Sequence, residues 1–303
     1  MSSRANPKVV VLMGGPSVER DVSLSSGAEC AVALRETGYD VIEVDAGPDL
    51  AARLTQIKPD IVFNALHGRW GEDGCVQGML EWMKIPYTHS GVMASAVTMD
   101  KQRTKDVYAA HGLPCVHSVI ATAAQVQLDH VLPPPYVVKP YNEGSSVGIY
   151  IIQAADGPPQ LAADMPDLVM VETYAPGREL TTAVMGDRAL TVTDIIVDGW
   201  YDYAAKYAAG GSRHVIPADI PTDIFDACMD YAERAHRVLG CRGLSRTDFR
   251  WDETRGLDGL IILETNTQPG MTPTSLAPEQ AASVGVSFPD LCRWMVEDAS
   301  CDR

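Results

Sequence analysis

The chain has 303 residues, enough for one large domain or two to three smaller domains with hydrophobic cores. With 46% hydrophobic and 21% charged residues, its composition is ordinary for a globular protein in water. The formal net charge of −16 argues against a broad nucleic-acid or anionic-membrane surface, because either would need a basic patch. Any site for an anionic ligand must therefore gather its few cations locally.

The cysteines and the apolar runs bear on the location of the protein. The seven cysteines are scattered and form no C-x-x-C pair, which argues against a disulfide framework or a zinc cluster. No signal-peptide core precedes the first predicted strand. No apolar run approaches the roughly 18 residues that a membrane span needs. We therefore expect a cytoplasmic protein with neither a nucleic-acid nor a membrane partner.

The first third of the chain alternates strands and helices. A helix should begin between Ser17 and Asp21 and run to Glu36, and another should lie before the third strand. Such alternation predicts a parallel sheet with right-handed crossovers. The strands are expected at residues 8–13, 41–44 and 60–66. A loop carrying His67 and a short helix to Lys84 follow. This pattern predicts an α/β domain over residues 1–91.

A second unit is expected over residues 92–178. It should begin with a helix at 99–111, closed by Gly112. Its strands are expected at 136–139, 148–152 and 169–173.

A third unit is expected over residues 179–303. Strands are predicted near 180–185 and 190–196, and a short helix near the end of the chain. Thr222 should cap an amphipathic helix that Gly240 ends. Residues 200–217 form a long polar and aromatic stretch without periodicity, which is typical of a functional loop.

A predicted hairpin, residues 245–251 and 260–266, gives the clearest chemical signal. Side chains two apart share a strand face, so Arg246 lies beside Asp248 and Glu264 beside Asn266. If the turn centres on Gly256, Asp248 and Glu264 are directly opposed, which costs stability unless something lies between them. Two carboxylates and an amide oxygen suit Mg²⁺. The alternative is a solvated sheet face, but residues 260–263 look too apolar for that.

Weaker signals come from four other segments. Lys139 ends a strand before a Gly-Ser-Ser loop, whose small residues would let backbone N–H groups approach phosphate. The loop is not a P-loop, and by itself a Gly-Ser loop is more often only a turn. Glu19 lies at a strand-to-helix junction, where a first-turn carboxylate needs no further role. Lys101 alone reads as a solvated lysine. The tyrosines and lysine of residues 201–207 suggest a lid, although packing of the loop's own side chains would also explain them.

Taken together and in order, these segments closely resemble the D-alanine–D-alanine ligases, a branch of the ATP-grasp superfamily. The resemblance covers essentially the whole chain. It rests on GGPSVERDVSLSSG, HGRWGEDG, MDKQRTK, VVKPYNEGSSVGI, GRELT, YDYAAKY, LSRTDFRWD and LETNTQPGMTPTSL. It implies an ATP-grasp fold that is α/β in the N-terminal part and α+β in the C-terminal part. Residues 1–91 would then bind substrate, 92–178 form the central domain, and 179–303 the catalytic domain with its lid at 200–217.

The resemblance also implies roles for individual residues. ATP would bind between the second and third domains, with Lys101 and Lys139 on its phosphates and Glu179 on its ribose. The implied catalytic residues are Glu19, Ser145, Tyr207 and Arg246. The implied ATP-binding residues are Lys101, Lys139, Ser146, Glu172, Thr173, Tyr174, Ala175, Glu179 and Lys206. The implied substrate-binding residues are Glu19, His67, Arg246, Gly270, Ser275 and Leu276. The implied ligands of two Mg²⁺ or Mn²⁺ ions are Asp248, Glu264 and Asn266.

The implied reaction joins two D-alanine molecules through an acyl phosphate, with ATP as the energy source. The resemblance also implies that the protein forms a homodimer. One alternative is a D-alanine–D-lactate ligase, on which Tyr207 bears, or another ATP-grasp carboxylate–amine ligase. A second is a nucleotide-binding regulatory module, against which Asp248, Glu264 and the lysines argue. A third is a nicotinamide oxidoreductase, which the missing G-x-G-x-x-G makes a poor fit.

Overall fold

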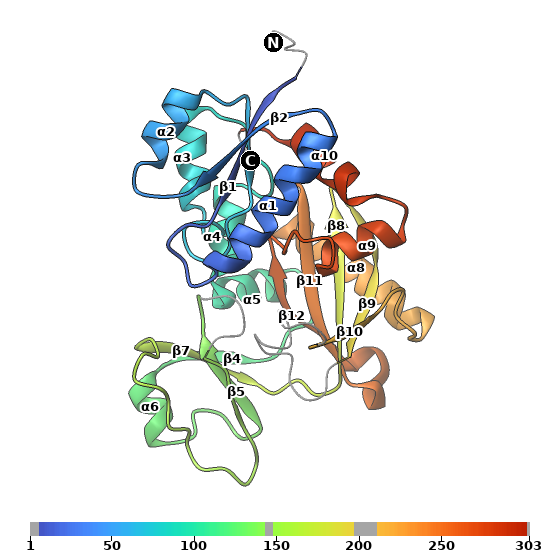
Figure 1. Cartoon of the computed structure of the whole chain (residues 1–303). Coiled ribbons are helices and arrows are strands. Elements are labelled where there is room, and N and C mark those ends of the chain that lie inside the picture. The colour runs from blue at the N-terminus through green and yellow to red at the C-terminus, as the bar shows by residue number, and fades with distance from the viewer. Residues whose placement is uncertain (1–5, 143–147, 197–210, 302–303) are drawn as a thin grey trace.

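The computed structural model describes residues 6–142, 148–196 and 211–301. They form three separate sheets (Figure 1), one parallel with three strands and two antiparallel with four and five strands. The expected α/β class with a parallel N-terminal sheet is confirmed. The three sheets follow one another along the chain, and the five-stranded sheet begins at Arg178. The domain boundaries near residues 91 and 178 stay predictions.

The N-terminal sheet has its most buried strand in the centre. Its order is β2-β1-β3, with β1 (Lys8–Met13), β2 (Asp40–Asp45) and β3 (Ile61–Asn64). Val9 and Val11 of β1 pack on one side and Val10 and Leu12 on the other, so both faces are covered. The covering helices are α1 (Arg20–Glu36), α2 (Leu50–Ile57) and α3 (Cys75–Met83).

The middle of the chain begins with two helices where one was expected. α4 (Val92–Met99) and α5 (Lys101–Ala110) are separated by Asp100, whose carboxylate accepts hydrogen bonds from the backbone N–H groups of Gln102 and Arg103. α4 was missed because it is a short apolar stretch without helical periodicity. Both helices pack against the C-terminal sheet, and the Tyr108 hydroxyl donates to Thr265 Oγ1 at 2.7 Å.

The four-stranded sheet of the middle region has the order β4-β7-β5-β6. Its strands are β4 (Ser118–Thr122), β5 (Tyr136–Pro140), β6 (Tyr150–Ile152) and β7 (Leu168–Thr173), with helix α6 (Ala123–Leu128) beside β4. No pattern in the sequence indicated β4 or α6. Lys139 lies near the end of β5 and Glu172 near the end of β7, in neighbouring strands.

The five-stranded sheet has the order β10-β9-β8-β11-β12. Its strands are β8 (Arg178–Met185), β9 (Arg188–Ile196), β10 (Arg213–Val215), β11 (Leu244–Trp251) and β12 (Leu260–Asn266). Two expectations are corrected here. Residues 213–215 of the expected lid are a strand paired with β9. The hairpin connection, η1 (Glu253–Gly259), has 3₁₀ turns on both sides of a kink at Gly256, so it is longer than the turn centred on Gly256 that was expected.

The helices of the C-terminal region complete the fold. They are α8 (Thr222–Val238), α9 (Leu276–Ser283), which the sequence did not reveal, and α10 (Phe288–Asp298). Thr222 does not cap α8: the N-cap is Pro221, without a side-chain cap bond, because Thr222 is already the first helical residue. α10 returns to lie beside α1 (Figure 1), so both ends of the chain share one core. Among the described residues, no helix is long and apolar enough to cross a membrane.

Candidate active site

A cavity of about 710 Å³ opens where the N-terminal and C-terminal regions meet. Its walls come from α1, the loop after β3, the α4–α5 junction, β12 and the segment that leads into α9. Nine residues expected at substrate, ATP or metal sites line it: Glu19, His67, Lys101, Arg246, Glu264, Asn266, Gly270, Ser275 and Leu276. The structure thus brings together side chains from distant parts of the sequence. Ser145, Ser146, Lys206 and Tyr207 lie outside the described residues.

The hairpin has the predicted register from Arg246 to Asp248, and a β-bulge between Asp248 and Phe249 shifts the pairing towards the connection. Asp248 is directly opposite Glu264, and Arg246 is opposite Asn266. Each carboxylate has its own cation: Arg246 donates to both oxygens of Asp248 at 2.8 and 2.7 Å, and Lys101 Nζ lies 3.5 Å from Glu264. Asp248 also accepts a hydrogen bond from Thr181 Oγ1 at 2.6 Å. The like charges therefore face one another because neighbouring cations compensate them.

These residues form a candidate metal site of unusual composition. In the part of the chain that the structure describes, no three His, Cys, Asp or Glu side chains gather as a metal cluster. The candidate rests instead on two carboxylates and the amide of Asn266, whose Oδ1 accepts a hydrogen bond from Gln268 N at 2.8 Å. All three supply hard oxygen ligands, the type that Mg²⁺ prefers.

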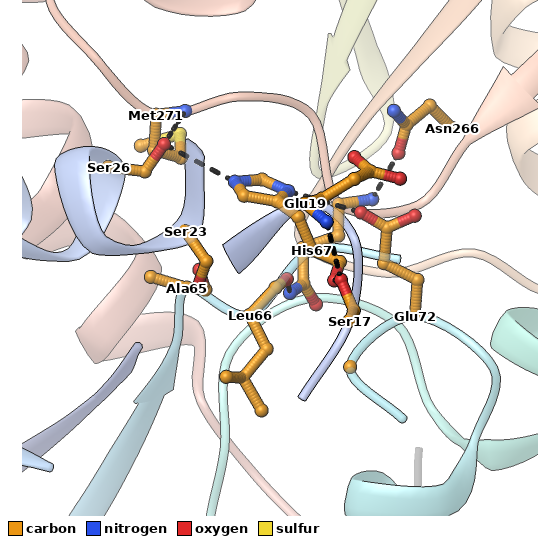
Figure 2. A network of polar contacts seen from close by, with 12 residues as sticks. Ser17, Glu19, Ser23, Ser26, Ala65, Leu66, His67, Glu72, Asn266 and Met271 are labelled. Atoms are coloured by element: carbon orange, nitrogen blue, oxygen red, sulfur yellow. Dashed lines mark hydrogen bonds and ion pairs between the residues drawn. The ribbon is translucent and has the colours of Figure 1, made fainter. Parts of the chain in front are cut away.

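Glu19 and His67 belong to one polar network beside the cavity (Figure 2). Ser17 Oγ donates to His67 O at 2.7 Å and accepts from Glu19 N at 2.9 Å. The His67 ring lies between Glu72 at 3.1 Å and Ser26 at 3.3 Å. Glu19 and His67 are only 6% and 4% exposed, and these contacts fix the buried His67 ring and the backbone of Glu19.

A glycine makes this arrangement possible. Gly68 has φ +70°, a conformation that L side chains rarely adopt. A Cβ atom there would lie 3.0 Å from both Glu19 Oε1 and Ser17 Oγ. Only glycine therefore lets the loop after β3 close against the Glu19 carboxylate without displacing it.

Two buried amides that the sequence did not single out join the two ends of the site. Asn64 Nδ2 donates to Gln268 Oε1 at 2.9 Å, and Gln268 Nε2 donates to Leu66 O. Both side chains are at most 1% exposed. Asn64, a polar residue inside an apolar strand, was the available signal. The pair connects the end of β3 to the chain just after Asn266.

A second group of residues lies at the linker from the four-stranded to the five-stranded sheet. We call Lys105, Lys139, Glu172, Glu179 and Arg250 the linker cluster. Glu172 is bound by two lysines: Lys139 Nζ lies 2.5 Å from one carboxylate oxygen and Lys105 Nζ 2.6 Å from the other. Burial alone would raise the pKa of Glu172, but the two positive charges outweigh it and hold that pKa below its ordinary value.

The rest of the linker cluster fixes the residues expected around the adenine and ribose. Arg250 donates to Ala175 O and to the Glu179 carboxylate, each at 3.1 Å. The backbone of Thr173 donates to His117 O at 2.9 Å, and that of Tyr174 to Pro135 O at 3.2 Å. Sequence reasoning missed Arg250 and Lys105, although Lys105 lies one helical turn after Lys101. None of the five cluster residues lines the cavity, so the site has two parts.

Comparisons with known proteins agree with this arrangement. The family models for the D-ala D-ala ligase N-terminus and C-terminus match residues 46–90 and 109–297. A curated D-alanine–D-alanine ligase of Roseobacter denitrificans is 73% identical over all of this chain and 95% of its own length. That of Ruegeria pomeroyi is 70% identical over all of this chain and 99% of its own.

Solved structures give the same fold. A D-alanine–D-alanine ligase from Bacillus anthracis superposes with a TM-score of 0.79 at 27% identity, covering 96% of this chain and 97% of that one. A second structure of the Bacillus anthracis enzyme, complexed with ATP, has a TM-score of 0.77 at 23% identity. It also covers 96% of this chain and 97% of its own, and this similarity concerns the fold alone.

Proposed function

Because the chain belongs to the D-alanine–D-alanine ligase family, we propose that it joins two D-alanine molecules into D-alanyl-D-alanine, with ATP as the energy source. The product would serve peptidoglycan precursor synthesis. The observation that carries the proposal is one cavity that gathers Glu19, Lys101, Arg246 and Glu264 from four separate segments. The regulatory-module and oxidoreductase alternatives explain neither this cavity nor the opposed hairpin carboxylates.

The first step would transfer the γ-phosphoryl group of ATP to the carboxylate of the first D-alanine. Glu19, buried at the cavity wall, would hold the ammonium group of that substrate. Lys101 and Lys139 would balance the charge of the phosphates, and the linker residues Glu172–Ala175 would take the adenine. Such fixed cations stabilise charge that spreads over the transferring group.

Asp248, Glu264 and Asn266 fit a divalent cation, because their oxygens come from adjacent positions of two paired strands. Mg²⁺ or Mn²⁺ bound there would neutralise phosphate charge during the transfer.

The second step would be attack of the second D-alanine amine on the acyl carbon. Ser275 is the N-cap of α9, and the first turn of a helix offers free N–H groups that attract a carboxylate. Ser275 and Leu276 would therefore receive the carboxylate of the second substrate. Arg246 and the backbone near Gly270 would stabilise the oxyanion that forms. Phosphate then leaves as the peptide bond forms.

Three finer points belong to the same proposal. The acceptor is D-alanine rather than D-lactate, with Tyr207 contributing to that choice. Ser145, Ser146, Lys206 and Tyr207 would act from the two loops that close over ATP. The protein works as a homodimer in the cytoplasm.

The test is direct. The purified chain is given ATP, Mg²⁺ and D-alanine, and phosphate release and dipeptide formation are followed together. Equal amounts of phosphate and dipeptide support the proposal, whereas ATP binding without phosphate release would favour a regulatory module. Adding D-lactate in competition at neutral and slightly acidic pH measures the amide-to-ester ratio. An excess of ester would overturn the acceptor assignment, and light scattering would measure the oligomer.

A further inference from the structure

The linker cluster places two lysines on one carboxylate. Glu172, on β7, is 6% exposed at its side chain, and its two oxygens are taken by Lys105 of α5 and Lys139 of β5. One carboxylate neutralises only one ammonium group, so this trio carries an extra positive charge below the surface. A buried charge without a partner is expensive. Either lysine can therefore leave only if the other remains.

The two lysines are not equivalent. Lys105 is held a second time, because its Nζ also donates to Val116 O at 3.2 Å. Its side chain is 5% exposed against 12% for Lys139. Burial also lowers the pKa of Lys105, and the attraction of Glu172 opposes this effect. Lys105 is thus the anchored partner of Glu172, and Lys139 is the more accessible one.

We propose that Lys105 is a positioning residue for ATP: it remains with Glu172 as a fixed counterion, so that Lys139 is free to move to a nucleotide phosphate. This inference rests on the proposed function, because it takes Lys139 to be a phosphate ligand. Without Lys105, Lys139 would have to neutralise the buried carboxylate by itself. Each ATP molecule would then have to compete with Glu172 for it. Lys105 would also keep the adjoining adenine linker in place through Glu172.

The first measurement compares Lys105→Met with the wild-type chain. We expect the KM for ATP to rise by about tenfold or more, the size typical of interacting charges in contact. The KM for D-alanine should change less than twofold, because Lys105 does not line the cavity. Lys8→Met is the matched control, since Lys8 Nζ also donates to a backbone carbonyl, Ile57 O at 3.2 Å, but in the N-terminal domain. It should leave both constants unchanged.

The second measurement separates positioning from general support of the fold. In a Glu172→Gln background there is no buried carboxylate to compensate, so adding Lys105→Met should raise the KM for ATP less than twofold further. A purely structural lysine would instead cost the same in both backgrounds. If Lys105→Met does not fold, Lys105→Gln replaces it, because its amide keeps a donor for Val116 O and removes only the charge. The same selective rise in the KM for ATP is expected from it.

The outcomes are distinguishable. If the wild-type chain releases no phosphate with ATP and D-alanine, the proposed function fails. If it does, and the folded Lys105 variant has the ATP affinity of wild type, the inference about Lys105 is wrong. An equal loss with and without Glu172 would also overturn it.

Discussion

Two sides of the candidate site are held by different kinds of interaction: the cavity side around Glu19 and His67, and the ATP side, which comprises the linker cluster and the ion pairs of Lys101 and Arg246. The cavity side depends mainly on neutral hydrogen bonds, such as the one between Asn64 and Gln268. The ATP side depends on ion pairs, in which nearly every cation already has a carboxylate at rest. These pairs are Lys139–Glu172, Lys105–Glu172 and Arg250–Glu179 in the linker cluster, and Lys101–Glu264 and Arg246–Asp248 where the hairpin borders the cavity.

This difference follows from what each part has to bind. A chain with a net charge of −16 must keep its cations local and compensated until an anionic ligand arrives. Ion pairs serve this purpose, because ligand phosphates can exchange with the carboxylates. Neutral hydrogen bonds offer no such exchange and hold a wall in place. We therefore expect substitutions on the ATP side to change ligand binding and catalysis, and those on the cavity side to change geometry and stability.

The largest effect is expected from Glu264→Gln. The change removes a charge that the divalent cation needs and should lower kcat by about a thousandfold or more, since a metal contributes several kcal/mol. The fold should persist, because the Glu264 side chain is 36% exposed. Turnover at ordinary Mg²⁺ concentration measures the loss of kcat, and a thermal melt checks that the fold persists. Glu253→Gln, at a 58% exposed carboxylate paired with Arg178, is the control. Turnover like that of wild type would refute the metal assignment.

The hairpin chemistry was predictable because it is local. The period-two alternation fixes which side chains share a face, and pairing of the two strands then opposes Asp248 to Glu264. The boundaries of the helices were harder to predict from the sequence. Thr222 is a favoured capping residue, yet Pro221 occupies the N-cap. Asp100, a real cap, starts α5 at Lys101, two residues after the expected start at Met99. Competing cap residues within one or two positions cannot be ranked by propensity alone.

The residues that sequence reasoning missed all depend on distant partners. Lys105 looks like one more solvated lysine on a polar helix, and its partner Glu172 is 67 residues away. Gln268 meets Asn64 across 204 residues. Burial and pairing of such groups arise only when domains pack together, so no local pattern reports them. The resemblance helped only where a residue falls in a recognised motif with an assigned role.

His236 provides a further test of the comparison, because it is a buried titratable group behind strand β11 of the ATP side. His236 of α8 is buried against Ser245, with Nδ1 2.7 Å from its hydroxyl, and burial lowers the pKa of His236 to about 4. The unfolded chain, with a pKa of about 6.5, takes up a proton that the folded state refuses. Stability should therefore be lost as the pH falls from 6.5 towards 4, by roughly 2 kcal/mol between pH 7 and pH 5.

Urea unfolding of wild type and His236→Gln at both pH values measures this effect. The other acid-titrating groups are common to both proteins, so the difference between their slopes isolates His236. Parallel pH dependences would show that His236 takes up its proton over the same pH range in the folded and unfolded states, so that burial does not keep the imidazole neutral.

On the cavity side, Gly68→Ala tests whether the wall positions Glu19. The left-handed backbone alone costs about 1–2 kcal/mol for a residue with a Cβ atom. Gly240→Ala is a close control, because Gly240 has φ +71° against +70° and a Cβ atom there would meet nothing within 4 Å. Both variants should lose similar stability. Only Gly68→Ala should raise the KM for D-alanine, by about tenfold, and equal KM values would remove Glu19 from the substrate site.

The smallest effect concerns Asn64 and Gln268 themselves. If the two amides stabilise the fold through their mutual hydrogen bond, Gln268→Leu should cost about 1–3 kcal/mol of unfolding free energy, because it leaves buried polar groups without a partner. The double change with Asn64→Leu should cost less than the sum of the single changes, by about 1 kcal/mol. Gln280 provides the control cycle: it is equally buried but bonds to Ala183, Thr181 and Thr193 instead. Combined with Asn64→Leu, Gln280→Leu should be additive. Additivity in the Gln268 cycle as well would mean that the two ends of the site are held independently. The proposed difference between a cavity side fixed by coupled hydrogen bonds and an ATP side held by exchangeable ion pairs would then be wrong.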